Sequence, residues 1–169
     1  MSNFALVLAA ASGLLLGASL CEGCPFPFEE IGSQCLLFDT LESGNYYDMR
    51  LYCTRVAEGA RLAKVPTASQ LTEIIKYILK FGLDRYNYWI DATDKDLEGY
   101  WKWGDGTSVP MGAPYWRYDC DTALTMRPLT NEQQNCAILD KESNYLFADT
   151  SCLGNIGELK YCPVCEILT

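Results

Sequence analysis

Apolar residues in the first third of the chain recur at helical intervals. A first set is spaced three or four positions apart and consists of Tyr46, Met49, Cys53, Val56 and Ala57. This spacing places all of them on one face of an α-helix. Gly59 follows the set, and glycine is common just after the end of a helix. The pattern predicts a helix that carries Cys53 on its buried face and ends near Gly59.

A second helix is predicted directly downstream. Thr67 is followed three positions later by Gln70, the spacing of a capping box at a helix start. The apolar residues that come next also keep helical spacing, and they are Leu71, Ile74, Ile75 and Ile78. Gly82 supplies the stop signal. We therefore expect an amphipathic helix between Thr67 and Gly82.

The pattern changes after this helix. Short apolar and aromatic runs lie at residues 88–90, 100–103, 136–139 and 159–164, separated by Gly, Pro, Asp and Asn. Such runs are typical of β-strands. Residues 104–135 contain many turn formers and little periodicity. A loop of this length in a compact domain usually has a function, so we expect it to be structured and to hold a binding site.

The chain begins with an uncharged apolar segment at residues 4–20. It is at the short limit of a membrane span and ends in small residues, which favours a secretory signal. We expect residues 1–23 to be a signal peptide and residues 24–169 to be one secreted domain. Cleavage after Ser19 is the alternative, and it would retain Cys21 as an odd thiol.

The chain has nine cysteines and no histidine. Besides Cys21 they are Cys24, Cys35, Cys53, Cys120, Cys136, Cys152, Cys162 and Cys165. Removal of residues 1–23 would leave these eight, and an even number of cysteines in a short secreted chain is typical of a disulfide framework. Two CxxC spacings, at residues 21–24 and 162–165, raise zinc or redox chemistry as alternatives. The zinc alternative lacks a full ligand set and the redox alternative lacks a helix that starts at the motif, so structural disulfides are favoured.

Catalysis has little support in the sequence. Without histidine the Ser-His-Asp, Cys-His and His-ligated zinc arrangements are excluded. The pair Asp94 and Asp96 is interpreted as surface carboxylates without a pocket, which disfavours glycosidase chemistry. We therefore expect a protein that is not an enzyme.

Aromatic signatures identify a family resemblance. The sequence has WID at residues 89–91 and EGYWKW followed by GDG at residues 98–106. These resemble the WIGL and EGxWxWxDG signatures of the C-type lectin-like domain family. GARLAKV at residues 59–65 and VCE at residues 164–166 resemble two further segments of that family. The resemblance implies an α+β fold with two helices, small antiparallel sheets and a long structured loop, stapled by disulfides.

The resemblance also implies a disulfide pairing. Three pairs follow from the family frame, namely Cys24 with Cys35, Cys53 with Cys165, and Cys136 with Cys152. Cys120 and Cys162 are then left for each other, as a bridge outside the common family set. This fourth bridge would restrain the long loop.

Sugar-binding members of the family, as the resemblance implies, hold one calcium ion. Its ligands come from a loop tripeptide with a central proline, a later acidic residue and an Asn-Asp pair after an aromatic. Calcium takes about six to eight oxygen ligands. The proline corresponds to Pro128, flanked by Arg127 and Leu129. Arg127 brings a permanent positive charge to this position, and the side chain of Leu129 has no oxygen.

The remaining ligand positions are incomplete as well. Gln134 stands where an acidic residue is expected, and FAD at residues 147–149 replaces the aromatic-Asn-Asp triplet, so that Asp149 alone is retained. We expect a degenerate calcium site and no cofactor. A shifted alignment that brings Asn131 and Glu132 into the loop positions is the alternative.

Other candidate ligand-binding residues surround the long loop. Tyr115 and Tyr118 could stack on a sugar ring or anchor a protein interface, whereas Trp116 is expected to pack on the core. Two acidic pairs, Asp119 with Asp121 and Asp140 with Glu142, could form a secondary cation site. The favoured interpretation is that these acids are solvated turn residues.

The charge balance limits the partners. The chain has 13 basic and 22 acidic residues and a net charge of −9. An acidic surface disfavours nucleic acid and anionic membranes. The resemblance, to soluble immune lectins of arthropods in particular, implies recognition of carbohydrate on microbial surfaces, with agglutination if the protein oligomerises. Two hypotheses follow: glycan binding through an atypical, calcium-independent long-loop site, or protein binding by a scaffold without sugar binding.

Overall fold

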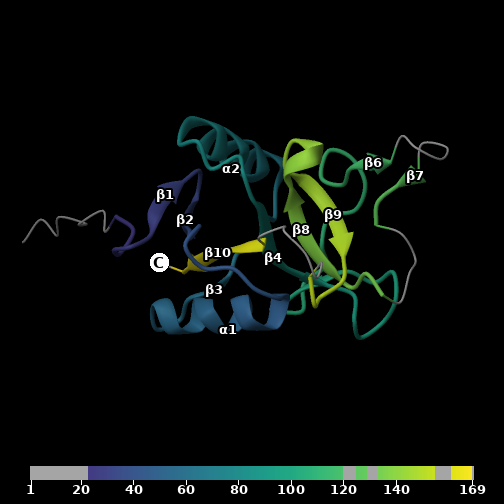
Figure 1. The fold of residues 1–169 in the computed structure, drawn as a ribbon, viewed down its shortest axis with the longest axis horizontal. Helices are drawn as coiled ribbons and strands as arrows, with labels where there is room; N and C mark the ends of the chain where they lie inside the picture. Colours follow the sequence, from purple (N-terminus) through teal and green to yellow (C-terminus); the bar gives the residue numbers. More distant parts are fainter. Residues whose placement is uncertain (1–22, 120–124, 129–132, 155–160, 169) are drawn as a thin grey trace, which may run out of the picture.

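The computed structural model describes residues 23–119, 125–128, 133–154 and 161–168. They form an α+β fold in which the two helices, α1 (Tyr46–Val56) and α2 (Ala68–Lys80), lie on opposite sides of a β-sheet (Figure 1). No helix in these four segments is both long enough and apolar enough to cross a membrane.

Both predicted helices are confirmed: α1 ends at Val56, three residues before Gly59, and α2 lies between Thr67 and Gly82. The side chain of Asn45 caps α1 by accepting from the Asp48 N–H at 2.9 Å, and Thr67 caps α2 by accepting from the Gln70 N–H at 3.1 Å. The prediction that the Gln70 side chain completes a capping box is wrong. The Gln70 side chain turns away and bonds the Ile31 carbonyl and the Ser33 N–H. It therefore joins α2 to the amino-terminal hairpin.

The strands were only partly predicted. They are β1 (Glu29–Ile31), β2 (Gln34–Phe38), β3 (Arg61–Leu62), β4 (Asn87–Thr93), β5 (Lys102–Trp103), β6 (Tyr118–Asp119), β7 (Thr125–Met126), β8 (Cys136–Asp140), β9 (Leu146–Thr150) and β10 (Tyr161–Ile167). A 3-10 turn, η1 (Lys141–Ser143), joins β8 to β9. The runs at 88–90 and 136–139 lie inside β4 and β8, whereas 100–103 yields only the short β5. The start of the run at 159–164 is outside the described residues.

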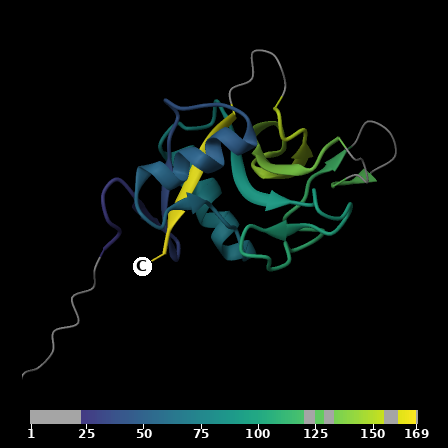
Figure 2. The ribbon, with the colours of Figure 1, turned by 90° about the horizontal axis from the view of Figure 1, so that it is seen from below.

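The main sheet joins the two ends of the chain. Its order is β1-β2-β10-β4-β8-β9, with β3 on β10 and β5 on β4. β10 is the last strand in sequence, and it runs antiparallel to β2 and parallel to β4. Figure 2 shows α1 lying across β10. The carboxyl-terminal strand therefore lies at the centre of the fold.

The sheet has a hydrophobic core on each face. Tyr88, Ile90 and Ala92 belong to the core beneath α2, and Trp89 belongs to the one beneath α1. This alternation follows from the two-residue repeat of a strand. Because both faces are covered, all residues of β4 except the last are buried, including the polar Asn87 and Asp91.

Within the described residues, three disulfides staple the fold. They join Cys24 to Cys35, Cys53 to Cys165, and Cys136 to Cys152. These are the three pairs that the family frame implies, and all three are confirmed. Cys162 is fully buried in the core beneath α2. Its proposed partner Cys120 lies outside the described residues, as does Cys21, so the fourth bridge stays a prediction.

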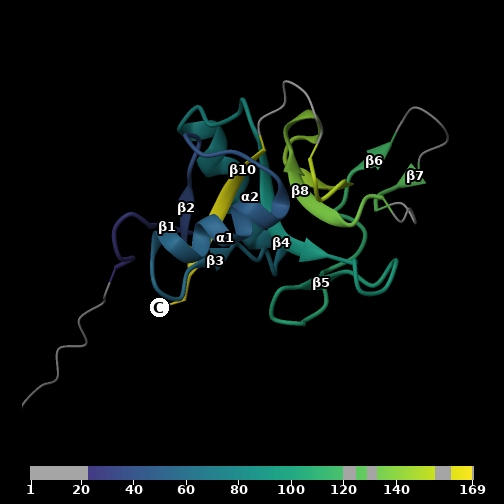
Figure 3. The ribbon, with the colours of Figure 1, turned by 60° about the horizontal axis from the view of Figure 1, so that its bottom comes forward.

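The long loop does have structure. Its central strands, β6 and β7, pair as a separate antiparallel ribbon with Tyr118 opposite Met126. Figure 3 shows this ribbon at the end of the molecule opposite β1. The base of the loop is fixed to the core, because Trp116 is buried and its indole N–H donates to the Pro110 carbonyl at 2.8 Å.

Candidate functional site

A polar groove of about 440 Å³ lies between the base of the long loop and the β8–β9 hairpin. Its lining comes from the loop, the hairpin, η1 and the starts of β4 and β10, and comprises Asn87, Arg117, Arg127, Gln133, Gln134, Ile138, Asp140, Lys141, Glu142, Ala148, Asp149, Thr150, Ser151 and Tyr161. Three residues of the expected calcium site, Arg127, Gln134 and Asp149, meet in it.

Arg127 connects these residues through one guanidinium nitrogen. Its Nη1 lies 3.1 Å from Asp149 Oδ1, 3.2 Å from Asp149 Oδ2 and 3.1 Å from Gln134 Oε1. The Asp149 side chain is fully buried and that of Arg127 is 12% exposed. Hydrogen bonds of this charge-assisted kind are stronger than neutral ones. The guanidinium thus holds together the loop, the segment before β8, and β9.

The residues present do not fit a calcium ion. The expected ligands Asp149 and Gln134 both bond a guanidinium, which repels a dication at the same position. Ala148 has no side-chain oxygen and lies at the position of the amide ligand. The Arg127–Pro128 peptide is cis. Leu129, Asn131 and Glu132 lie outside the described residues, so the shifted alignment is untested.

A second arginine is arranged in the same way. Arg117 Nη1 lies 2.7 Å from Asp140 Oδ2, and the Asp140 side chain is only 6% exposed. The interpretation of Asp140 as a solvated turn residue is therefore wrong. Sequence reasoning missed this pair because its partners, 23 positions apart, meet only when the loop packs on the hairpin. Glu142, in contrast, is exposed at 76% of its side chain.

Tyr115 and Tyr118, two other predicted site residues, are not part of the described lining of this groove. Tyr115 is half-buried, with its ring centroid 5.8 Å from that of Phe147. Trp116 is buried, as predicted. Tyr118 is 45% exposed on the β6–β7 ribbon. Asp119 belongs to β6, but its side chain and all of Asp121 are outside what the structure describes.

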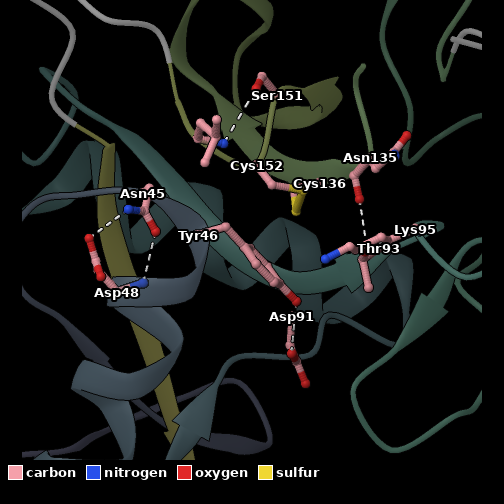
Figure 4. Close-up of a disulfide and its surroundings, with 11 residues drawn as sticks. Asn45, Tyr46, Asp48, Asp91, Thr93, Lys95, Asn135, Cys136, Ser151 and Cys152 are labelled. Carbon is pink, nitrogen blue, oxygen red and sulfur yellow. Dashed lines mark hydrogen bonds between the residues drawn. A yellow bond between two sulfur atoms is a disulfide. The ribbon is translucent and has the colours of Figure 1, made fainter. Parts of the chain in front are cut away.

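The Cys136–Cys152 disulfide links two segments that line the groove. It joins the start of β8, two residues after Gln134, to the turn after β9 that contains Ser151. Figure 4 shows this disulfide with two neighbouring contacts, from Thr93 to the Asn135 carbonyl at 2.6 Å and from Tyr46 toward Asp91. The segments that supply Gln134 and Asp149 are therefore anchored covalently and to β4.

Asp91 is a buried carboxylate that sequence reasoning left unexamined. It accepts from the Tyr46 hydroxyl at 3.2 Å and from the Gly104 N–H at 3.0 Å, with Arg50 Nε 3.9 Å away. Burial raises the pKa of Asp91, partly offset by Arg50 and these hydrogen bonds. A Cβ on Gly104 would lie 2.1 Å from Asp91 Oδ2, so this position needs glycine.

A second, smaller groove of about 260 Å³ corrects the interpretation of Asp94 and Asp96. Both line it, together with Arg50, Tyr100 and Lys102 among others. Asp94 is only 2% exposed, and burial raises its pKa. One carboxylate is thus buried rather than on the surface. The Gly99 N–H bonds its Oδ2 at 2.8 Å, which shows that this aspartate holds the turn after β4.

Comparisons with known proteins agree with this geometry. Residues 42–161 match the family described as the lectin C-type domain. Perlucin of Haliotis laevigata is 32% identical over 81 residues, and C-type lectin Cal of Crotalus atrox is 26% identical over 83 residues. Each match covers 48% of this chain, and it covers 50% of perlucin and 60% of Cal, so only part of each relative is spanned.

The fold is likewise shared with solved structures. Human lithostathine superposes with a TM-score of 0.66 at 21% identity, covering 95% of this chain and all of that protein. The family consists in general of binding proteins rather than enzymes. The family signature extends over most of the chain, and the two-helix, disulfide-stapled sheet superposes on a solved structure. This protein therefore belongs to the C-type lectin domain family.

Proposed function

We propose that this protein is a secreted, pattern-recognising lectin that binds carbohydrate on microbial surfaces through the groove of Arg127, Gln134 and Asp149, without calcium. The observation that carries the proposal is the Arg127 guanidinium bonded to Asp149 and Gln134. A built-in cation takes over the bridging task of a metal ion. It orders the loop permanently and leaves the groove formed in the absence of calcium.

The lining of the groove suits a polyhydroxylated ligand. It combines charged groups with the amides of Gln133 and Gln134 and the hydroxyls of Thr150 and Ser151. Amides and hydroxyls both donate and accept hydrogen bonds, as sugar hydroxyls require. The apolar edges of Ile138 and Tyr161 offer contact for the ring carbons.

Secretion is part of the same proposal. The three disulfides are typical of an oxidising, extracellular compartment. The signal peptide at residues 1–23 lies almost entirely outside the described residues. Mass spectrometry of the protein secreted by insect or yeast cells tests it: a mature amino terminus at Cys24 is expected, and an uncleaved terminus contradicts it.

The binding proposal is tested on a glycan array, with the oxidised protein in calcium and in EDTA. Signals that persist in EDTA are expected. Ser151→Tyr, which fills the groove, should abolish them, whereas the matched variant Thr54→Tyr, on the exposed face of α1, should leave them unchanged. Signals that vanish in EDTA, or that survive Ser151→Tyr, contradict binding in this groove.

A protein-binding role is the second candidate. It is favoured by three exposed apolar side chains on and beside the β6–β7 ribbon: Met111, Tyr118 and Met126, at 51%, 45% and 37% exposure. Exposed methionine and tyrosine are enriched where proteins meet partners. An array without any glycan signal, combined with partner capture that Tyr118→Ser and Met126→Ser abolish, would favour this role.

A further inference from the structure

The charges of the main groove are layered, with cations outside and acids inside. The side chains of Arg117 and Arg127 are 25% and 12% exposed, whereas their partners Asp140 and Asp149 are 6% and 0% exposed. Each guanidinium therefore lies between a buried carboxylate and the solvent. In each pair the arginine is the more exposed partner, and both partners line the groove.

The two arginines are neighbours. The Arg127 N–H donates to the Arg117 carbonyl at 2.9 Å, so the two residues occupy adjacent segments of the loop base. Their carboxylates lie along one hairpin, because Asp149 pairs with Ala137, three residues before Asp140. At about 3.3 Å per residue, the two pairs are separated by roughly 10 Å along the strand.

A third cation extends this row. Lys141 follows Asp140 in η1 and lines the same groove, with its side chain 26% exposed. Its backbone N–H donates to Asn87 Oδ1 at 2.9 Å, which fixes η1 against β4. Among the lining residues that the structure describes, the exposed acid is Glu142, with its Oε1 3.7 Å from the Lys141 ammonium. The negative group thus stands beside the last cation of the row.

We propose that the glycan bound in this groove is acidic, a saccharide carrying carboxylate or sulfate groups that face Arg117, Arg127 and Lys141. The inference rests on the proposed function. A guanidinium has five donors in a planar fork that matches an oxyanion, and it can bond a second anion while paired with the first. In a chain of net charge −9, neighbouring cations at one groove concentrate the attraction for an anion there.

The same layering disfavours a long polyanion as the partner. Nucleic acid needs a wide basic surface to release its counterions, and the acidic exterior of this chain opposes it. A short run of acidic sugars reaches the three cations without covering the rest of the molecule. Oligosaccharide acids therefore fit better than duplexes or anionic membranes.

The test is titration calorimetry in EDTA with tetragalacturonate, a carboxylated oligosaccharide, and with its methyl ester, which has the same sugars without charge. Dextran sulfate and dextran form a second pair that asks whether sulfate also serves. We expect the acid of at least one pair to bind at least tenfold more tightly than its neutral form, with affinity that falls as salt rises.

Two adjacent surface variants provide opposite predictions. Lys141→Gln should weaken binding of the acid about threefold, and Glu142→Gln should strengthen it about threefold, as expected for single exposed charges near an ionic ligand. Lys102→Gln, a cation of the other groove, should change nothing. Both η1 variants leave the two arginine pairs intact, so neither relies on a destabilised fold.

The outcomes separate the two proposals. Equal binding of acid and neutral forms overturns the acidic-glycan inference and leaves carbohydrate binding in the groove standing. Binding that Lys141→Gln and Glu142→Gln shift in the same direction also overturns the inference. No binding of these probes, together with a blank glycan array, overturns both. Preference for only carboxylate or only sulfate supports the inference and identifies the acid.

Discussion

At the scale of single residues, Arg127 is the side chain on which the site depends most. It is almost buried, and its carboxylate partner is completely buried. Removing one member of such a pair leaves the other charge without compensation in a medium that solvates it poorly. Arg127→Met should therefore lower the free energy of unfolding by about 3 kcal/mol, measured by urea denaturation of the oxidised protein.

Two further variants show whether the loss comes from the stranded charge. The exposed Arg85→Met, a matched control, should change stability by less than about 0.5 kcal/mol. Adding Asp149→Asn to Arg127→Met should recover part of the loss, because it removes the unpaired carboxylate. The pair does not act in this way if Arg127→Met is as stable as wild type. The same follows if the double variant loses more unfolding free energy than the two single variants lose together.

Asp91 gives a prediction about pH. Its pKa is raised by burial above the ordinary 3.8, so the folded state holds the proton more tightly than the unfolded state. The stability that this tighter proton binding contributes is fully present at a pH below the ordinary pKa, and it is lost as the pH rises through the raised pKa. Between pH 4 and pH 7, wild type should therefore lose unfolding free energy relative to Asp91→Asn.

Asp105 is the matched control for this experiment. Hydrogen bonds from Lys64 and Thr107 lower the pKa of its carboxyl, so its contribution is present above the ordinary pKa and lost only in stronger acid. Relative to Asp105→Asn, wild type should not lose stability as pH rises from 4 to 7. If the difference in unfolding free energy between wild type and Asp91→Asn stays constant from pH 4 to pH 7, Asp91 does not titrate as described.

The residue scale also shows where sequence reasoning ends. That Arg127 is incompatible with a cation site follows from its charge alone. The sequence does not reveal that Arg127 bonds Asp149 and Gln134, or that Arg117 covers Asp140. These contacts join segments separated by 7 to 23 positions through the folded loop. Acidic residues after a strand normally face water, and only the loop that packs over Asp140 makes it an exception.

At the scale of elements, the disulfides differ in the length of chain that they close. Cys53–Cys165 links α1 to β10 across 112 positions, and Cys24–Cys35 spans 11. In the loop-entropy picture, these lengths correspond to about 4.7 and about 3 kcal/mol. Replacing both cysteines by alanine should therefore destabilise the protein more at Cys53–Cys165, as judged by urea midpoints. The opposite order would contradict the entropic account for this fold.

Helices were easier to predict from sequence than strands, for a physical reason. α1 and α2 each bury one stripe, which produces a periodic pattern with a capping residue at its start. β1, β2 and β9 are short, and their pairing partners are distant or follow a turn that only the fold reveals. The Gln70 side chain shows the same limit, because its true partners belong to the β1–β2 turn.

At the scale of the whole molecule, the fold places a rigid groove where the long loop meets a disulfide-anchored hairpin. The core beneath α2 holds the loop through Trp116, and Cys136–Cys152 holds the hairpin. We propose that a site built this way needs no metal ion to order it. The family frame and the aromatic signatures predict this architecture, whereas the ligand depends on the charges that this chain adds.

Titration of calcium into the oxidised protein, followed by calorimetry, tests most directly whether a guanidinium has replaced the ion. No saturable heat is predicted between micromolar and low millimolar calcium, because the positive charge of Arg127 lies against Asp149 and Gln134 and repels a dication there. Saturable binding in that range, lost in Asp149→Ala, would contradict the central claim.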